Sequence, residues 1–247
     1  LNAADRVRSR LFPQTFRRHI GAFGIVVAVT LAGSVFGMFA ILLDPDAKAA
    51  IMPFPGVLAD PAKRVEIEEQ QADRDRLEGM KAQGAAFYMT HNTKVSILTM
   101  AMGISYGVGT IVLIFYNGVV IGAVALDYIL AGETVFLVGW LLPHGSVEIP
   151  AILLAGQAGL VLGGALIGWG QRASLRQRLR AVAPDLATLI CGVAIFLVWA
   201  GIVESFFSQY HEPTIPYALK IAIGCVELAL VVLYLAYSGR GASTEKP

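Results

Sequence analysis

The sequence predicts an all-α fold: a polytopic transmembrane helical bundle of about six spans, with a broken or re-entrant segment near residues 132–145. Two observations predict this class. Hydrophobic residues make up 56% of the 247 residues and charged residues only 15%, whereas a soluble globular domain carries about 25% charged residues. The charges are also clustered, and several uncharged runs between the clusters reach the roughly 20 residues that a helix needs to cross a bilayer core.

Charge, cysteine content and motifs exclude several other classes. A net charge of +1 gives no indication of a nucleic-acid partner, so none is expected. Cys191 and Cys225 each lie inside an apolar run, where cysteine is ordinarily a small buried hydrophobe, so no disulfide framework is expected. The chain also lacks a glycine-rich phosphate loop, a G-x-S-x-G elbow and a Cys/His nucleophile pair. We therefore expect neither an enzyme nor a bound cofactor.

Residues 1–19 form a basic arm. It carries five arginines that alternate with bulky apolar side chains, which is typical of an amphipathic segment lying in the membrane interface. Pro13 is expected to break or bend this segment; the alternative is a plain basic tail that only sets topology. Ile20–Leu43 is the first span, and it contains Gly33 and Gly37 at the spacing that lets helices pack closely. This run is too long for a signal-peptide core, so we expect it to stay uncleaved.

Residues 44–94 form the one large polar segment, with seven Lys/Arg and nine Asp/Glu. Asp60 followed by Pro61 predicts a helix start, because aspartate caps an N-terminus and proline suits the first helical position. A helix is expected over 62–83, with Gly84 as its end. Two charge pairs at helical spacing support this helix: Arg64/Glu68 and Arg74/Glu78.

The second span is predicted over residues 95–116. Residues 119–142 are apolar but are interrupted by Gly132 and Glu133, and the part after this interruption is too short to cross a bilayer as a helix. We therefore expect this stretch to break near Pro143 and fold back at the outer surface, where protein or a cavity buries the irregular backbone. Three further spans are predicted: 146–169, 186–203 and 217–237.

The basic residues indicate the orientation of these spans. The arm, the 172–180 stretch and the tail at 238–247 together hold eleven Lys/Arg, and such segments stay on the cytoplasmic side. Six spans place all three segments inside and residues 44–94 outside, as parts of one transmembrane domain over 20–237. Five spans, the alternative, would put the basic arm and the basic C-terminus on opposite sides.

Ionisable residues inside spans are energetically costly and are candidates for function. His144 and Glu148 are one helical turn apart and share a helix face, while Glu204 lies at the outer end of the fifth span. Glu227 lies in the sixth span, with Lys220 earlier on the same face. For Glu148 a helix-start interaction, and for Glu227 an interhelical hydrogen bond, are the structural alternatives. His144 and Glu148 offer only two ligands where zinc needs three or four, so no metal is expected.

Two blocks of sequence carry a resemblance to a known family. Residues 88–122 read YMTHNTKVSILTMAMGISYGVGTIVLIFYNGVVIG, and residues 142–160 read LPHGSVEIPAILLAGQAGL. The pattern L-P-H-G-x-x-E-x-P-A followed by A-G-x-A-G-L is highly specific. Over roughly residues 12–237 the chain resembles the stage II sporulation protein M family, which often has two asparagines where this chain has His91 and Asn92. The positions that match the family signature are Asn92, Asn117, Gly118, His144, Gly145, Glu148, Pro150 and Ala151.

The resemblance implies a membrane-embedded subunit or scaffold in a prokaryotic cell membrane, and the charge distribution places both termini on the cytoplasmic side. The family's founding member anchors stage II sporulation proteins D and P, which remodel peptidoglycan during engulfment. Most members occur in organisms that never sporulate, and a fold does not by itself assign a function. Beside the lipid bilayer, we expect protein partners from a cell-envelope complex.

Two functions from different classes fit the sequence. The first is a non-enzymatic membrane scaffold or complex subunit, which recruits envelope partners through residues 44–94. The second is a permease subunit of a transporter, which a broken helix and buried carboxylates would suit; its partner is then a cytoplasmic ATPase, or the chain forms a homo-oligomer. A membrane hydrolase that uses His144 and Glu148 is a third alternative. The ATPase contact of the permease is expected at a basic stretch: Arg172, Arg176, Arg178 and Arg180.

Labelling with an impermeant thiol reagent tests the topology. Cysteines introduced at Glu69 and Gln209 are expected to react from outside intact cells, whereas a cysteine introduced at Gln177 is not, because the charge distribution places residue 177 inside. Labelling of position 177 in intact cells would end the six-span topology.

Overall fold

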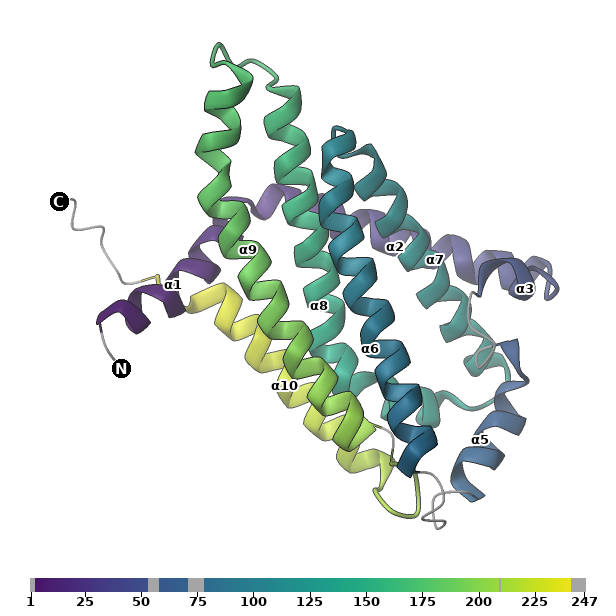
Figure 1. The fold of residues 1–247 in the computed structure, drawn as a ribbon. Coiled ribbons are helices and arrows are strands. Elements are labelled where there is room, and N and C mark those ends of the chain that lie inside the picture. Colours follow the sequence, from purple (N-terminus) through teal and green to yellow (C-terminus); the bar gives the residue numbers. More distant parts are fainter. Residues whose placement is uncertain (1–2, 53–57, 71–77, 209, 241–247) are drawn as a thin grey trace.

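The structure of the chain is a computed structural model that describes residues 3–52, 58–70, 78–208 and 210–240. Every regular element among these residues is a helix, which confirms the predicted all-α bundle. The helices in chain order (Figure 1) are α1 (Ala3–Arg18), α2 (Ile20–Leu43), α3 (Ala47–Ile51), α5 (Pro61–Gln70), α6 (Glu78–Ala101), the short 3₁₀ helix η2 (Met102–Ser105), α7 (Val108–Leu130), α8 (Thr134–Ile167), α9 (Leu175–Val203), the π-helical turn η3 (Glu204–Ser208) and α10 (Tyr217–Tyr237).

Long apolar helices make this chain a membrane protein. Five described helical segments are long and apolar enough to cross a bilayer: α2, α7, α8, α9 continued by η3, and α10. Their outward sides carry large exposed apolar residues, such as Phe39 of α2, Ile195 of α9 and Leu230 of α10. Such side chains suit lipid, whose tails are as apolar as leucine. The predicted bounds of the first and last spans are those of α2 and α10.

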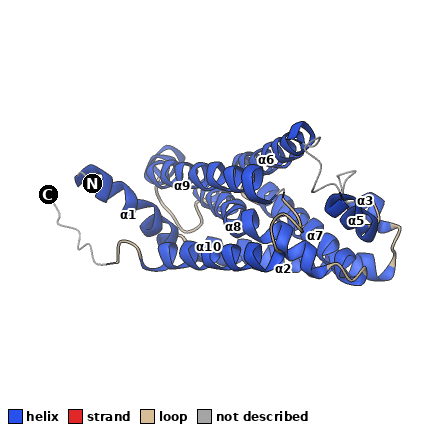
Figure 2. Ribbon diagram, turned by 90° about the horizontal axis from the view of Figure 1, so that it is seen from below, coloured by secondary structure: helices blue, strands red, loops and turns tan. Residues whose placement is uncertain are grey.

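Helix α8 lies at the centre of the bundle. Figure 2 shows it with α9 and α6 on one side and α10 and α2 on the other, and all four of these helices contact it. Of the five candidate spans it is the most enclosed, with 61% of its apolar stretch buried. The side chains of α8 therefore decide what the interior of the bundle contains.

Helices α6 and α7 form a pair that is joined by a tight turn over residues 102–107, where Gly107 has a φ of 84°. The prediction of one continuous span over 95–116 is therefore wrong, because the turn divides it. The physical reason is close contact with α8: a Cβ on Gly103 would overlap the backbone of Gly159. Glycines at such crossings let two backbones touch, so the turn packs directly on the central helix.

Helix α6 is as long as a membrane span but less apolar. It has 24 residues, but its sequence includes Lys81 and Lys94, and it is not among the five apolar segments. With α6 included, successive long helices alternate in direction (Figure 1). Five candidate spans and this sixth long helix agree roughly with the predicted bundle of about six spans.

The broken segment predicted near residues 132–145 is a turn followed by an unbroken helix. Helix α7 continues through Asn117, the chain turns at 131–133, and Gly132 has a φ of 82° there. Helix α8 then runs through Pro143 and Pro150 without a break. The break predicted at Pro143 is wrong because other helices enclose α8. Their packing offsets the backbone hydrogen bond that each proline removes.

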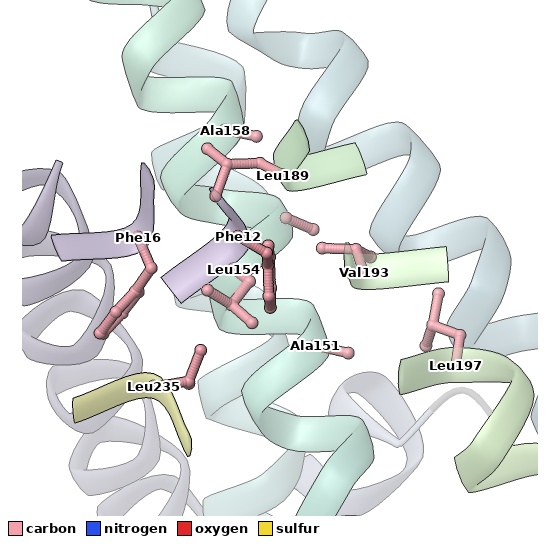
Figure 3. Packing of buried hydrophobic residues seen from close by; sticks show 10 residues of the cluster. Phe12, Phe16, Ala151, Leu154, Ala158, Leu189, Val193, Leu197 and Leu235 are labelled. Carbon is pink, nitrogen blue, oxygen red and sulfur yellow. The ribbon is translucent and has the colours of Figure 1, made fainter. Parts of the chain in front are cut away.

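The N-terminal arm is a helix that packs on the bundle. Helix α1 is continuous through Pro13, so of the predicted break or bend, the break is wrong. Phe12 and Phe16 enter a buried cluster with residues of α8, α9 and α10 (Figure 3), so neighbouring packing holds the helix together. Arg17 donates to the backbone oxygen of Ser238 at 2.7 Å. A cation suits the carbonyl end of a helix, and this contact ties the arm to the end of α10.

Helix α9 begins earlier than the sequence predicts. Ser174 caps it with the reciprocal hydrogen bonds of a capping box. The basic stretch at 172–180 and the fifth span at 186–203, which were predicted separately, therefore join in one helix. Asp185 pairs with Arg18 of the arm at 2.6 Å. The turns of α9 before this pair project beyond the arm, together with the end of α8 (Figure 1).

The polar segment 44–94 contributes α3, α5 and the first part of α6. Asp60 Oδ1 accepts a hydrogen bond from Ala62 N at 3.0 Å, so the predicted helix start is confirmed. Residues 71–77, which include one member of the predicted Arg74/Glu78 pair, lie outside the described residues. Helix α6 continues through Gly84, so the helix end predicted there is wrong. A glycine inside a helix costs only about 1 kcal/mol, which the packing of α6 on α8 offsets.

The contact between α2 and α7 is the most extensive helix contact described. Gly33 and Gly37 of α2 meet the backbone of α7, and Gly118 and Gly122 of α7 meet the backbone of α2. Small residues on both helices let the two backbones approach closely. Gly118, a predicted site residue, therefore serves this helix contact.

Replacing Gly122 by alanine is expected to destabilise the bundle by about 1–3 kcal/mol, because the new Cβ would overlap the backbone oxygen of Ser34. Gly164→Ala is the matched control: Gly164 lies in α8 with no atom within 4 Å of the added Cβ. That variant is expected to be neutral, or up to about 1 kcal/mol more stable. Unfolding in mild detergent measures both. Equal losses for the two variants would contradict the backbone contact.

Candidate functional site

A cavity of about 270 Å³ lies between α6, α7 and α8, and η3 contributes to its wall. Helices α6 and α7 diverge from their common turn (Figure 1), and α8 forms the floor between them. Most of the lining is apolar, as is usual for a ligand site, with a few convergent polar groups. The principal polar residues of the lining are His91, Asn92, Tyr116, Asn117, His144, Glu148 and Glu204.

Three ionisable side chains are deeply buried in this lining: His144 is 4% exposed, Glu148 6% and Glu204 1%. The Asn92 side chain forms a hydrogen bond with the Glu148 carboxylate. His144 Nδ1 lies 3.0 Å from Ser208 Oγ. Glu204 Oε2 is buried and has no hydrogen-bond partner among the described residues. Glu148 and Glu204 both belong to the lining, so the cavity brings two carboxyl groups together.

Local helix geometry explains this convergence. His144 and Glu148 are one turn apart on α8, so both point to the same side. Glu204 begins the π-helical turn at the end of α9, and such turns are frequent at functional sites. Asn92 and Asn117 come from α6 and α7, and the tight turn between these helices brings both into the cavity lining. Gly145, which was also predicted, lies in the floor beside His144.

Helix α5 covers Trp140, one of the residues that line the cavity. The Arg64 guanidinium lies 4.3 Å from the centre of the Trp140 ring, an attractive arrangement of a cation over an aromatic face. Arg64 also donates from Nη1 to Tyr128 Oη at 2.8 Å and from Nε to Glu68 at 2.6 Å. The Arg64/Glu68 pair predicted from helical spacing is therefore present, and Arg64 fastens α5 to α7 and α8.

Two glutamates join α5 to α10 and the loop before it. Glu68 Oε2 lies 2.9 Å from His211 Nε2, and Tyr217 Oη donates to Glu69 Oε1 at 2.9 Å. Burial raises the pKa of Glu68, but hydrogen bonds from His211 and Arg64 and their charges outweigh burial and hold the pKa below its ordinary value. Glu68 is therefore ionised at neutral pH. Its hydrogen bonds are charge-assisted and correspondingly strong.

Several predicted residues lie outside the cavity. Trp199 Nε1 donates to Glu227 at 3.0 Å, and Ser146 Oγ donates to it at 3.4 Å. Glu227 thus forms the interhelical hydrogen bonds of the structural alternative. Lys220, which precedes Glu227 on the same face of α10, is fully buried, and its Nζ donates to the backbone oxygen of Ser208 at 2.8 Å. Pro150 lies within α8 and is not part of the lining.

The four arginines predicted to dock a partner fall into two groups. Arg178 donates from Nε to the backbone oxygen of Ala165 at 2.9 Å and from Nη2 to that of Leu166 at 3.1 Å. It therefore satisfies carbonyl groups at the end of α8. The other three are exposed beside the projecting ends of α8 and α9: Arg172, Arg176 and Arg180.

Sequence reasoning missed two contacts in the region that we call the outer cover, which consists of α3, α5 and the residues that they contact. Asp127, near the C-terminal end of α7, pairs with Lys48 of α3 at 2.6 Å. An isolated acid in an apolar run needs a partner, and that requirement was the available signal. His211, which binds Glu68, lies in a loop where no periodicity or motif marks it.

The sequence of this bundle is similar to sequences of known proteins. Residues 23–209 match a family described as Stage II sporulation protein M. The chain is also 35% identical over 72 residues to an uncharacterised protein of Methanocaldococcus jannaschii. This match covers 29% of the chain and 40%, less than half, of that protein. No solved structure matches the chain.

The Asn92–Glu148 hydrogen bond gives a stability prediction. Glu148→Gln keeps a side chain that can bond Asn92 and is expected to be tolerated. Glu148→Leu leaves the Asn92 amide without this partner and is expected to cost about 1–3 kcal/mol. Because removal of both partners can be nearly neutral, the double variant Glu148→Leu/Asn92→Leu should recover part of this loss. Unfolding in mild detergent measures all three, and a double variant less stable than Glu148→Leu would contradict the contact.

Proposed function

The chain belongs to the stage II sporulation protein M family, and from this premise we propose that it is a non-enzymatic integral membrane subunit of a cell-envelope complex. In this proposal α5 is the surface that holds extracytoplasmic protein partners. The single observation that carries the proposal is the firm attachment of this short polar helix to the ends of three long helices.

One side of α5 is exposed among the described residues. Pro61 and Val65 are buried toward the bundle, and Arg64, Glu68 and Glu69 form the contacts to α7, α8 and α10. A helix held in this way presents its other side without further loss of conformational freedom when a partner binds, which favours affinity. The exposed residues of α5 include a large apolar side chain between charged ones: Ala62, Lys63, Glu66, Ile67 and Gln70.

The distribution of basic residues supports an extracytoplasmic position for α5. The arm, the end of α10 and the projecting end of α9 are linked by the contacts of Arg17 with Ser238 and of Arg18 with Asp185. These are the arginine-rich parts of the chain, and such parts stay in the cytoplasm. Helix α5 contacts the opposite ends of α7, α8 and α10, so on this orientation it faces the outside of a prokaryotic inner membrane.

A permease subunit is the second candidate, and the cavity favours it specifically. Carboxylates buried at membrane depth commonly belong to substrate or ion pathways. The exposed arginines on the projecting end of α8 and α9 would then contact a cytoplasmic ATPase. The two candidates place their essential protein contacts on opposite sides of the membrane.

Substitutions on the two sides separate these candidates. Lys63→Glu, Glu66→Lys and Ile67→Ser together change the exposed side of α5 while leaving its bundle contacts and net charge intact. The recovery of the envelope proteins that co-purify with the wild type in mild detergent is expected to fall at least tenfold for this variant. Mass spectrometry of tagged, membrane-extracted protein measures the recovery.

The matched variant Arg172→Glu/Arg176→Glu/Arg180→Glu changes three exposed residues on the other side. It is expected to keep the envelope partners. Unchanged partner recovery by the α5 variant, together with loss of a co-purifying ATPase from the arginine variant, would replace the scaffold function by the permease. Arg64→Ala serves as a control for displacement of α5, because it removes the contact to Trp140 and leaves the exposed residues in place.

A further inference from the structure

The cavity brings the carboxyl groups of Glu148 and Glu204 into one mostly apolar lining. An ionised carboxylate accepts hydrogen bonds and donates none, so such a pair suits a cationic donor. Glu204 Oε2 is buried and has no partner among the described residues. Lys220 directs its ammonium group to the backbone oxygens of Ser208 and Tyr210, at 2.8 and 2.7 Å. Among the described residues no Lys or Arg forms an ion pair with either carboxylate.

The cavity opens to the surface of the bundle between α6 and α7. Leu98 of α6 and Tyr116 of α7 belong to the lining, and they are 50% and 45% exposed. Exposed apolar side chains suit lipid tails, so we infer that this opening faces the bilayer. The gap between α6 and α7 therefore connects the carboxylates with the membrane through an apolar passage. The apolar residues of this passage include Val120, Ile121, Leu141 and Ile149.

We propose that this cavity binds the ammonium group of an amphipathic amine. The nitrogen lies between Glu148 and Glu204, and the apolar chain extends between α6 and α7 toward the bilayer. An ammonium group brings a positive charge and up to three N–H donors, which is what the two carboxylates lack. This site does not depend on the partner-binding side of α5, since no residue is shared between the two surfaces.

The size and composition of the cavity favour an organic cation over a bare metal ion. A volume of about 270 Å³ equals the liquid volume of roughly nine waters, far more than one ion occupies. Among the described residues no group of three or more His, Cys, Asp or Glu side chains is placed to hold a metal. The apolar walls would also gain from an apolar chain, at about 0.8 kcal/mol for each buried CH₂ group.

Binding of n-hexylamine to the full chain in mild detergent at pH 7 tests the site. Hexylamine is charged at this pH and is expected to bind saturably by calorimetry and to raise the unfolding temperature. n-Hexanol has the same chain without the charge, and it should bind at least tenfold more weakly. Glu204→Gln should weaken hexylamine binding at least tenfold. Glu227→Gln, which changes a carboxylate outside the cavity, should leave it unchanged.

A second variant keeps the test decisive if Glu204→Gln does not fold. Leu141→Phe narrows the apolar passage and leaves both carboxylates, so it should weaken hexylamine and spare methylamine. The proposal is overturned if hexylamine shows no saturable binding, if hexanol binds equally well, or if Leu141→Phe leaves hexylamine binding unchanged.

Competition between hexylamine and lipids, measured in lipid nanodiscs, identifies the source of the amine. If phosphatidylethanolamine competes with hexylamine where phosphatidylcholine, which lacks N–H donors, does not, the amine belongs to a lipid headgroup. Competition by neither lipid assigns the site to a soluble amphipathic amine.

Discussion

Close contact between glycine-bearing backbones is the constraint on which the rest of this bundle depends. Lipid offers helices no hydrophobic reason to associate, so packing distance decides which helices stay together. Glycines join α2 to α7, and Gly103 and Gly107 place the α6–α7 turn against Gly159 and Gly163 of α8. Because α6 and α7 are fixed at this end, they can diverge at the other. The cavity is the space that this divergence leaves above α8.

The opposite end of the bundle is held by a different kind of interaction. Arg64 places its charge over Trp140 and bonds Tyr128 and Glu68, while His211 bonds Glu68 from the loop before α10. These groups lie at the ends of α7, α8 and α10, where aromatic rings and partly exposed side chains satisfy them. Trp140 belongs to both regions, since it lines the cavity and lies under Arg64. The outer cover and the cavity are therefore parts of one continuous packed structure.

The sequence predicted the parts of the fold that depend on composition. Uncharged runs located α2 and α10 to the residue, and Asp60 with Pro61 located the start of α5, because these signals are local. It placed breaks wrongly at Pro13 and Pro143, and it missed the turn at 102–107. Whether a proline or a glycine breaks a helix in a membrane depends on which helices enclose it, and that information is not local.

Only the part of the candidate site that depends on local sequence signals was predictable. His144 and Glu148 were paired by helical spacing, and Glu204 stood out as an acid at the end of an apolar run. Their meeting with Asn92 and Asn117 depends on the α6–α7 turn, which periodicity could not supply. Glu227 gave the same sequence signal as Glu204, yet it bonds Trp199 between two helices. An isolated charge in a span thus indicates that a partner exists, but the fold decides whether that partner is a side chain or a ligand.

The energetic cost of burying the carboxyl groups helps to distinguish a purely structural bundle from one that binds a ligand. Helix packing by itself does not require carboxyl groups at positions 148 and 204, because replacing a buried polar group together with its partner by packed apolar groups can be nearly neutral. Glu148 offsets part of its burial through Asn92, whereas Glu204 leaves an oxygen without a partner among the described residues. A buried acceptor without a partner costs about 1–3 kcal/mol. In the proposed complex the ammonium group supplies the missing donor, so the atom that costs stability also favours binding.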